Sequence, residues 1–278
     1  MVGGGEGDEV EAGWADWLMP LGDDIPLDLA AARLGAEECG ADVATALGAL
    51  DALAASIPRV EDPTEQMARL VQHLFGTLGF RGDTETYDDP RNSCIDQVAT
   101  RGRGLPIALS VVLVEVGRRV GVPLLPIGFP GHFLVSTAPA AGSGVRVFLD
   151  PFAGGRIRPL PDLAGHLAGV LGRTPTRDEL ERALSESAVR DILVRMSTNL
   201  MRTWMGRGEP GHAERNASRR VALRPDLPSF RRDRGLLREQ LGDREGAAMD
   251  LGAYLQATPD APDAVRVRWQ LAVLLRHG

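Results

Sequence analysis

A repeat of 34 residues near the C-terminus most restricts how that part of the chain can fold. The matching positions are Ala213 and Ala247, and the dipeptides Pro225-Asp226 and Pro259-Asp260. Gly235 and Leu251 fall at offsets typical of a helix-pair repeat, in which small residues let paired helices approach and proline ends the second helix. The sequence therefore predicts an all-α repeat region over 186–278.

The preceding sequence predicts helices followed by strands. Helical apolar spacing covers 27–57, 64–78, a short segment ending near 101, and 106–120. Strands are expected near 124–128, 132–137 and 145–150, with 138–144 as a hairpin loop. Helices followed by an antiparallel sheet indicate an α+β domain, which we place at 23–185. Residues 1–22 are acidic and glycine-rich, and we expect them to form a mobile tail.

Composition argues against several function classes. All 31 basic residues are arginines, so no lysine can form a Schiff base. The net charge of −7 argues against a nucleic-acid partner. Eleven arginines lie within 195–240, and we interpret them as a solvated helical surface with intrahelical ion pairs. No Cys or His spacing suits a metal site, and no phosphate-binding loop or other cofactor motif is present.

The cysteines and the N-terminus bear on the location of the protein. Cys39 and Cys94, if they are two free thiols, suit a reducing cytoplasm. The N-terminus lacks the pattern of a signal peptide. The longest apolar run, 105–116, is too short to span a membrane. We therefore expect a cytoplasmic protein with no membrane partner.

A histidine and an aspartate stand at the ends of two expected neighbouring strands. His132 begins one strand, and Asp150 ends the next. A histidine oriented by a carboxylate can act as a general base, and the same pair can also simply tie two strands together. The helix that precedes them opens at Pro106, so no nucleophile is apparent at its start.

Several motifs together resemble the SirB-one family, a bacterial branch of the transglutaminase-like superfamily. They are Arg91-Asn92-Ser93, the run 103–110, the run 129–135, and Asp150 to Gly155. The resemblance covers roughly residues 25–276. It implies a papain-like α+β core with a helical N-terminal extension and a tetratricopeptide-like C-terminal region.

The resemblance also implies where catalytic groups would lie. His132 and Asp150 match the superfamily's histidine and aspartate. In active relatives a cysteine stands near the start of the central helix, where this chain has Pro106. The SirB-one branch commonly lacks this cysteine, so the resemblance implies fold more firmly than activity.

Two other side chains are candidate nucleophiles. Cys94 is expected in the first turn of a short helix, where the helix dipole would lower a thiol pKa, although a cysteine there can equally be a small buried hydrophobe. Ser110 lies one turn into the central helix and would need His132 within hydrogen-bond reach. A serine inside a helix more often bonds the carbonyl four residues earlier.

The last candidates are polar residues around the same cleft. Arg91, Asn92 and Arg103 could bind a carboxylate or a peptide end, or could cap helices and loop carbonyls. The sequence therefore favours a pseudoenzyme that binds a protein or peptide through the cleft, with Pro106 and Ser110 at its edge. The alternative is an acyl-transfer or hydrolytic enzyme that uses Cys94 with His132 and Asp150. A small-molecule or carrier-bound substrate, with substrate-assisted chemistry, is a third option.

Overall fold

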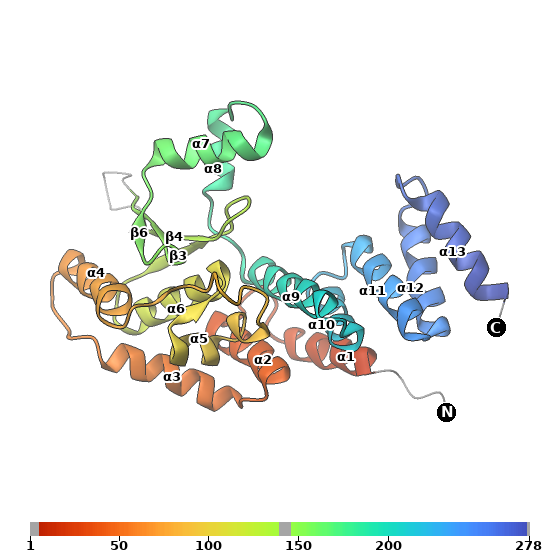
Figure 1. Cartoon of the computed structure of the whole chain (residues 1–278), viewed down its shortest axis with the longest axis horizontal. Helices are drawn as coiled ribbons and strands as arrows, with labels where there is room; N and C mark the ends of the chain where they lie inside the picture. The colour runs from red at the N-terminus through yellow and green to blue at the C-terminus, as the bar shows by residue number, and fades with distance from the viewer. Residues whose placement is uncertain (1–5, 139–145, 277–278) are drawn as a thin grey trace. The chain divides into compact units, whose positions relative to one another are not determined.

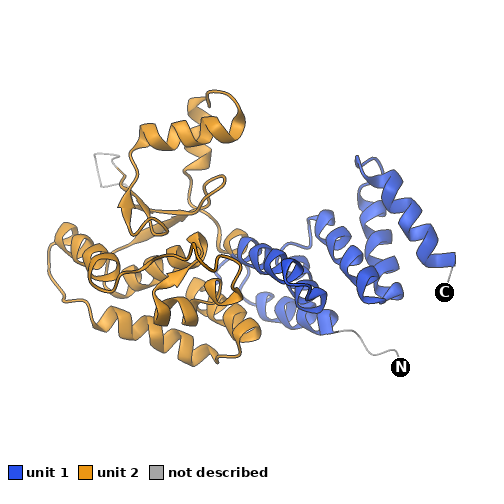
Figure 2. Ribbon diagram, in the orientation of Figure 1, with its two compact units in different colours: residues 1–25, 193–278 blue, residues 26–192 orange. Residues whose placement is uncertain are grey.

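The computed structural model describes residues 6–138 and 146–276, which form two compact units. One unit comprises residues 26–192, and the other combines residues 1–25 with 193–278 (Figure 2). The expected hairpin loop, 138–144, lies almost wholly outside the described residues. Helices dominate both units, and the strands belong to the first (Figure 1).

The helices of the 26–192 unit follow the expected spacing as far as residue 119, whereas the two helices after the sheet were not predicted. In chain order the helices are α2 (Leu27–Cys39), α3 (Val43–Ala55), α4 (Pro63–Val71), α5 (Ile95–Arg101), α6 (Pro106–Arg119), α7 (Leu160–Leu171) and α8 (Arg177–Ala183). A π-helix, Gln72–Thr77, continues α4, and a 3-10 helix, Pro90–Asn92, precedes α5. The segment 27–57 forms two helices because Gly40 ends α2 and the Asp42 side chain caps α3 by accepting from the Thr45 amide at 2.6 Å.

The main sheet of this unit is antiparallel, with strand order β3-β4-β5-β6. The strands are β3 (Leu124–Ile127), β4 (Leu134–Thr137), β5 (Phe148–Asp150) and β6 (Arg156–Ile157). The three expected strands are therefore present, and β6 was missed because two residues carry no readable alternation. A separate parallel pair joins β1 (Arg81–Gly82) to β2 (Arg103–Gly104).

The sheet lies between α6 on one side and α7 with α8 on the other (Figure 1). Helix α6 is buried from Ile107 to Gly117, which explains its nearly continuous apolar sequence. On the opposite face Leu134 and Phe148 pack in one cluster with Leu163 and Leu167 of α7. Neighbouring residues of a strand point to opposite faces, so the short strands serve both layers.

The second unit is all-α. Its helices are α1 (Glu6–Leu18), α9 (Val189–Gly206), α10 (Pro210–Leu223), α11 (Pro228–Leu241), α12 (Arg244–Ala257) and α13 (Ala264–Arg276). The expected repeat contacts are present, because α11 packs against α12 at Gly235. A Cβ on Gly235 would stand 2.9 Å from Cδ2 of Leu251, so a larger residue here would have to displace the Leu251 side chain.

The expectation of a mobile tail over 1–22 is wrong for the described part of that segment. Residues 6–18 form α1, which packs against α10 in the same unit. Trp14 is fully buried, and the guanidinium of Arg219 lies 5.5 Å from its ring centroid. The acidic side chains that suggested a solvated tail pair with arginines of α11: Asp8 with Arg238, and Glu11 with Arg234.

The arginine-rich segment is only in part the solvated surface that we expected. Arg219, Arg220, Arg234 and Arg238 are all buried. Arg234 donates two hydrogen bonds to the Asp250 carboxylate, at 2.6 and 2.7 Å. Burial alone would lower the pKa of Arg234, but Asp250 and Glu11 outweigh it and raise that pKa. These arginines therefore join helices inside the unit, where they are not available to phosphates.

Candidate functional site

The structure brings His132 and Asp150 together at one end of the sheet. His132 lies in the turn between β3 and β4, just after Gly131, whose φ of +71° favours glycine. Asp150 ends β5, the antiparallel neighbour of β4. Nε2 of His132 lies 2.8 Å from Oδ2 of Asp150, and the side chains are 16% and 4% exposed. The pairing that the sequence predicted is therefore present and mostly shielded from water.

Asp150 has three hydrogen-bond partners among the residues that the structure describes. Besides His132, the amide of Ala153 donates to Oδ1 at 3.0 Å and Nη1 of Arg158 donates to Oδ2 at 3.2 Å. Burial alone would raise the pKa of Asp150, but the hydrogen bond and charge of His132, with these two donors, hold that pKa below its usual value. Asp150 is thus a stable carboxylate that orients the imidazole.

Aromatic rings enclose the imidazole of His132. The ring of His166, from α7, stacks on it with centroids 6.4 Å apart. The ring of Phe152 meets it edge-on at 6.3 Å. Sequence reasoning missed Arg158 and His166. Arg158 could have been suspected because it follows Asp150 in a short hairpin, whereas no sequence pattern marks His166.

The start of α6 offers no nucleophile. Pro106 occupies its first turn, and Leu105 precedes it without a side-chain cap. Ser110 is fully buried, and its hydroxyl donates to the carbonyl of Pro106 at 2.8 Å. This is the bond to the residue four positions earlier that a serine inside a helix commonly makes.

The expectation of two free thiols is wrong, because Cys39 and Cys94 form a disulfide with their Cα atoms 6.7 Å apart. Cys94 is fully buried and is the residue that precedes α5, not a residue of its first turn. The bond joins the end of α2 to the start of α5, and these helices pack together. The argument for a reducing compartment therefore loses its premise.

The three polar candidates have partners in their own neighbourhood. Arg91 pairs with Asp89 at 2.6 Å, and its side chain is 59% exposed. Asn92 is fully buried, where its amide donates to the Thr86 carbonyl at 2.7 Å. Arg103 donates to the Gly79 carbonyl at 3.1 Å. The contacts described for these residues thus tie loops and helix ends together.

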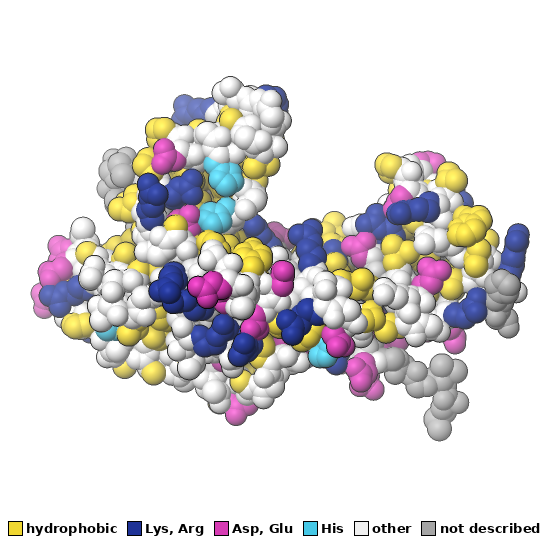
Figure 3. Space-filling view, viewed as in Figure 1, with side chains coloured by type: hydrophobic (Ala, Val, Ile, Leu, Met, Phe, Trp, Pro, Cys, Tyr) yellow, Lys and Arg dark blue, Asp and Glu magenta, His cyan; other side chains and the backbone are white. Residues whose placement is uncertain are grey.

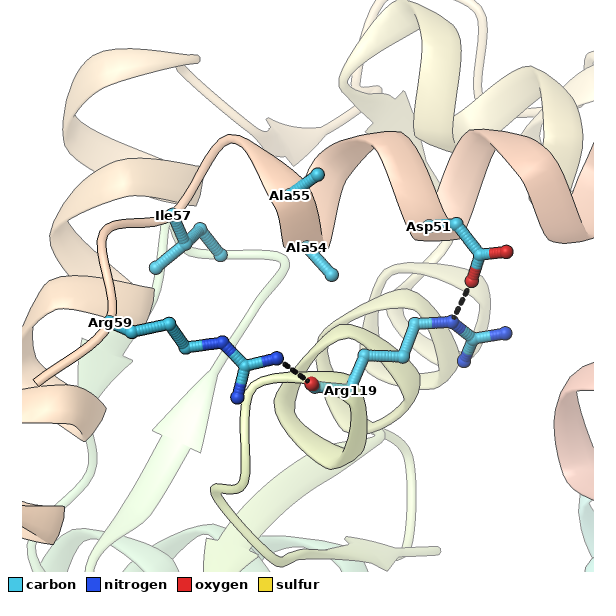
Figure 4. A pocket seen from close by; sticks show the side chains of 6 residues that line it. All are labelled: Asp51, Ala54, Ala55, Ile57, Arg59 and Arg119. Atoms are coloured by element: carbon cyan, nitrogen blue, oxygen red, sulfur yellow. Dashed lines mark hydrogen bonds and ion pairs between the residues drawn. The ribbon is translucent and has the colours of Figure 1, made fainter. Parts of the chain in front are cut away.

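One pocket, of about 290 Å³, lies where the end of α3 meets the end of α6 (Figure 4). Its charged groups already have partners. Arg59 donates to the Arg119 carbonyl at 2.5 Å, and Nε of Arg119 donates to Asp51 at 2.6 Å. Arg119 also pairs with Asp28 and Glu115. We interpret this pocket as part of a structural ion-pair network.

A larger pocket, of about 770 Å³, lies between the β5–β6 strands and α8, and we call it the Arg158 pocket. Its lining residues are Arg146, Val147, Phe148, Ile157, Arg158, Pro159, Leu160, Arg177, Leu180, Glu181 and Leu184. Arg158 belongs both to this pocket and to the hydrogen bonds of Asp150. On the face shown in Figure 3, arginine and histidine side chains gather below α7, next to hydrophobic ones.

Within 6–138 and 146–276, no group of three or more His, Cys, Asp or Glu side chains is placed to hold a metal ion. None of the helices described in these ranges is both long and apolar enough to cross a bilayer.

Two family models match the chain. The model of the transglutaminase-like superfamily matches residues 42–198, which include His132 and Asp150. A tetratricopeptide-repeat model matches residues 204–272. These matches confirm the transglutaminase-like domain and the tetratricopeptide-like region that the sequence predicted. No solved structure matches the chain.

Curated relatives share most of the chain. A UPF0162 protein of Xylella fastidiosa is 40% identical over 210 residues, which cover 75% of this chain and 74% of the relative. A UPF0162 protein of Pseudomonas aeruginosa is 30% identical over 235 residues, covering 83% of this chain and 84% of the relative. The UPF0162 protein YchA of Escherichia coli is 25% identical over 210 residues, covering 74% of this chain and 75% of the relative.

Proposed function

The chain belongs to the UPF0162 family and to the transglutaminase-like superfamily, and from that membership we propose that it binds a protein or peptide without transforming it. The observation that carries the proposal is at the start of α6. Where the resemblance implies a nucleophilic cysteine, the chain has Pro106, which bears no reactive group. The only two cysteines of the chain, Cys39 and Cys94, are bonded to each other.

The retained His132–Asp150 pair is compatible with this role. A general base accelerates acyl transfer by activating a nucleophile that it contacts. Here Asp150 and the rings of Phe152 and His166 hold the imidazole in place. In our proposal the pair fixes the turn before β4 against the end of β5 and so shapes a binding surface.

We further propose that α6 and the β3–β6 sheet form a papain-like core of the kind found in the SirB-one branch. A long buried helix packed on an antiparallel sheet supports this assignment. The tetratricopeptide-like region adds paired helices, an architecture that commonly presents a surface to peptides. Two parts of the chain thus favour a protein or peptide as the partner.

An enzyme that used Cys94 would have to meet two further conditions. The bond to Cys39 would have to be reduced, and the buried sulfur would have to become accessible. The surroundings of the Cys94 sulfur are those of a structural cysteine, because the sulfur is buried and lies 3.5 Å from the carbonyl oxygen of Pro90. No observation on the described residues favours this mechanism over binding.

The proposal is tested by asking whether bound peptides leave unchanged. The full chain is incubated with a random peptide pool, with and without a primary amine donor. Retained peptides are separated by size exclusion and weighed by mass spectrometry. We expect a retained subset with unaltered masses; peptides in which the amine or water has replaced ammonia, or peptides that are cleaved, would contradict the proposal.

A further inference from the structure

The Arg158 pocket has a largely apolar lining. Phe148 and Leu184, which form part of its wall, also belong to the core beneath the sheet. Ile157 and Leu160, by contrast, are 60% and 50% exposed although both are large and apolar. The volume of about 770 Å³ falls in the range of sites that enclose a small ligand or a few side chains.

The charged groups of the pocket favour an anion. Three arginines, Arg146, Arg158 and Arg177, line it together with one acidic residue, Glu181. Glu181 pairs with Nε of Arg177 at 2.7 Å. Arg158 uses one nitrogen, Nη1, for Asp150, and its other guanidinium donors have no partner among residues 6–138 and 146–276. Those donors match the geometry of a carboxylate.

Arg146 adds positive charge to the same pocket. Its guanidinium stacks 5.0 Å from the Phe148 ring centroid and donates to two neutral oxygens, the Leu184 carbonyl at 2.8 Å and the Ser136 hydroxyl at 2.5 Å. Burial lowers the pKa of Arg146, and the charge of Glu186 offsets this only in part. A bound anion would therefore be stabilised by a positive charge that Glu186 balances only in part.

We infer that the Arg158 pocket binds the C-terminal end of a peptide, with its free carboxylate on Arg158 and Arg177 and its last apolar side chains against Ile157 and Leu160. The inference rests on the proposed function, because it names the site and the chemistry of the bound peptide. A carboxylate next to an apolar body is the chemistry that complements arginines beside exposed aliphatic side chains.

The position of Arg158 also connects this pocket to the retained pair. A ligand carboxylate bound to Arg158 would contact the same side chain that donates a hydrogen bond to Asp150. The carboxylate that orients His132 and the carboxylate of the ligand would thus share one guanidinium. This arrangement would give the His132–Asp150 pair a place in binding.

The test compares two fluorescein-labelled peptide pools on the full chain by fluorescence anisotropy. Both pools end in two apolar residues after randomised positions, and one ends in a free carboxylate while the other ends in an amide. We expect the acid pool to bind about tenfold more tightly, since a charge-assisted hydrogen bond is worth roughly that factor. Equal binding of the two pools, or no binding of either, would overturn the inference.

Variants locate the site. Arg158→Met and Arg177→Met should each weaken the acid pool about tenfold, whereas Arg156→Met should leave it unchanged. Arg156 is a matched control because it is an exposed arginine of the same hairpin that does not line the pocket. The Arg177 side chain is 89% exposed, so its replacement does not threaten folding. An equal loss in Arg156→Met would contradict the assignment.

Two more outcomes are informative. Tighter binding of octanoate, an apolar acid without peptide groups, than of the acid pool would show that the site prefers a fatty acid to a peptide end and would overturn the inference. The masses of the pool peptides are measured after each titration. Altered masses would refute the proposed function even if the carboxylate preference held, so the two failures are distinguishable.

Discussion

Cys39, the last residue of α2, is covalently bonded to Cys94, the residue that precedes α5. The two cysteines are 55 positions apart in the sequence, and the segment between them contains α3 and α4. Cys39→Ala and Cys94→Ala should each lower the free energy of unfolding by about 2–4 kcal/mol. Urea unfolding of the oxidised protein measures this loss.

The double variant distinguishes a shared bond from two separate packing losses. Cys39→Ala/Cys94→Ala should cost little more than either single change, because one bond is lost in each case. A reductant should destabilise the wild type alone. Additive losses that do not respond to reductant would contradict a structural disulfide. Rapid alkylation in intact cells would then show whether the bond forms where the protein resides.

The carboxylate of Asp150 should make stability depend on acid pH. Its pKa in the folded state lies below the unfolded value of about 3.9, because His132, Ala153 and Arg158 outweigh the effect of burial. The folded state therefore binds fewer protons, and the stabilisation is present above about pH 4 and is lost as pH falls through the folded pKa.

Asp150→Asn tests this contribution. The substitution should lower the free energy of unfolding by about 1–3 kcal/mol at pH 7. This difference in unfolding free energy from the wild type should become smaller below about pH 4. Asp162→Asn, an exposed carboxylate on α7, is the control. Urea titrations across this pH range supply the measurement. If the difference in unfolding free energy between Asp150→Asn and the wild type stays constant with pH, then His132 and Arg158 do not stabilise the carboxylate.

Helix α1 should be needed for the stability of the helical unit. Trp14→Ala removes a fully buried indole and should cost about 3–5 kcal/mol, whereas Met19→Ala, at a side chain 77% exposed, should cost little. Thermal unfolding followed by circular dichroism separates these outcomes. Equal stability of the two variants would show that α1 is the mobile tail that composition suggested.

Loss of the buried ion pairs of α11 should also lower the free energy of unfolding. Asp250→Ala leaves Arg234 and Arg238 buried without their shared carboxylate and should cost about 3–5 kcal/mol. Asp260→Ala, at an exposed acidic residue, serves as the control. Replacement of Asp250 and Arg234 together by apolar residues should recover part of the loss, because no unpaired charge then remains at that position.

The sequence predicted the elements whose pattern is local. The apolar run of α6 and the strands that carry His132 and Asp150 follow from spacing, and the pairing of these two residues follows from adjacent strands. The repeat predicted the pairing of α11 with α12, because Gly235 marks a close approach that only a small residue permits.

The features that sequence reasoning missed depend on contacts between distant segments. An acidic, glycine-rich N-terminus resembles a tail unless buried arginines far along the chain are known to receive Asp8 and Glu11. Cys39 and Cys94 gave no spacing from which a bond could be read. The role of Arg158 became visible once β6 was seen to lie beside β5.

In our proposal the transglutaminase-like domain has no working nucleophile. The test is incorporation of a labelled primary amine into a glutamine-containing peptide pool, with reductant present so that Cys94 is released. We predict background incorporation for both the wild type and His132→Ala. Incorporation by the wild type that disappears in His132→Ala would contradict the claim.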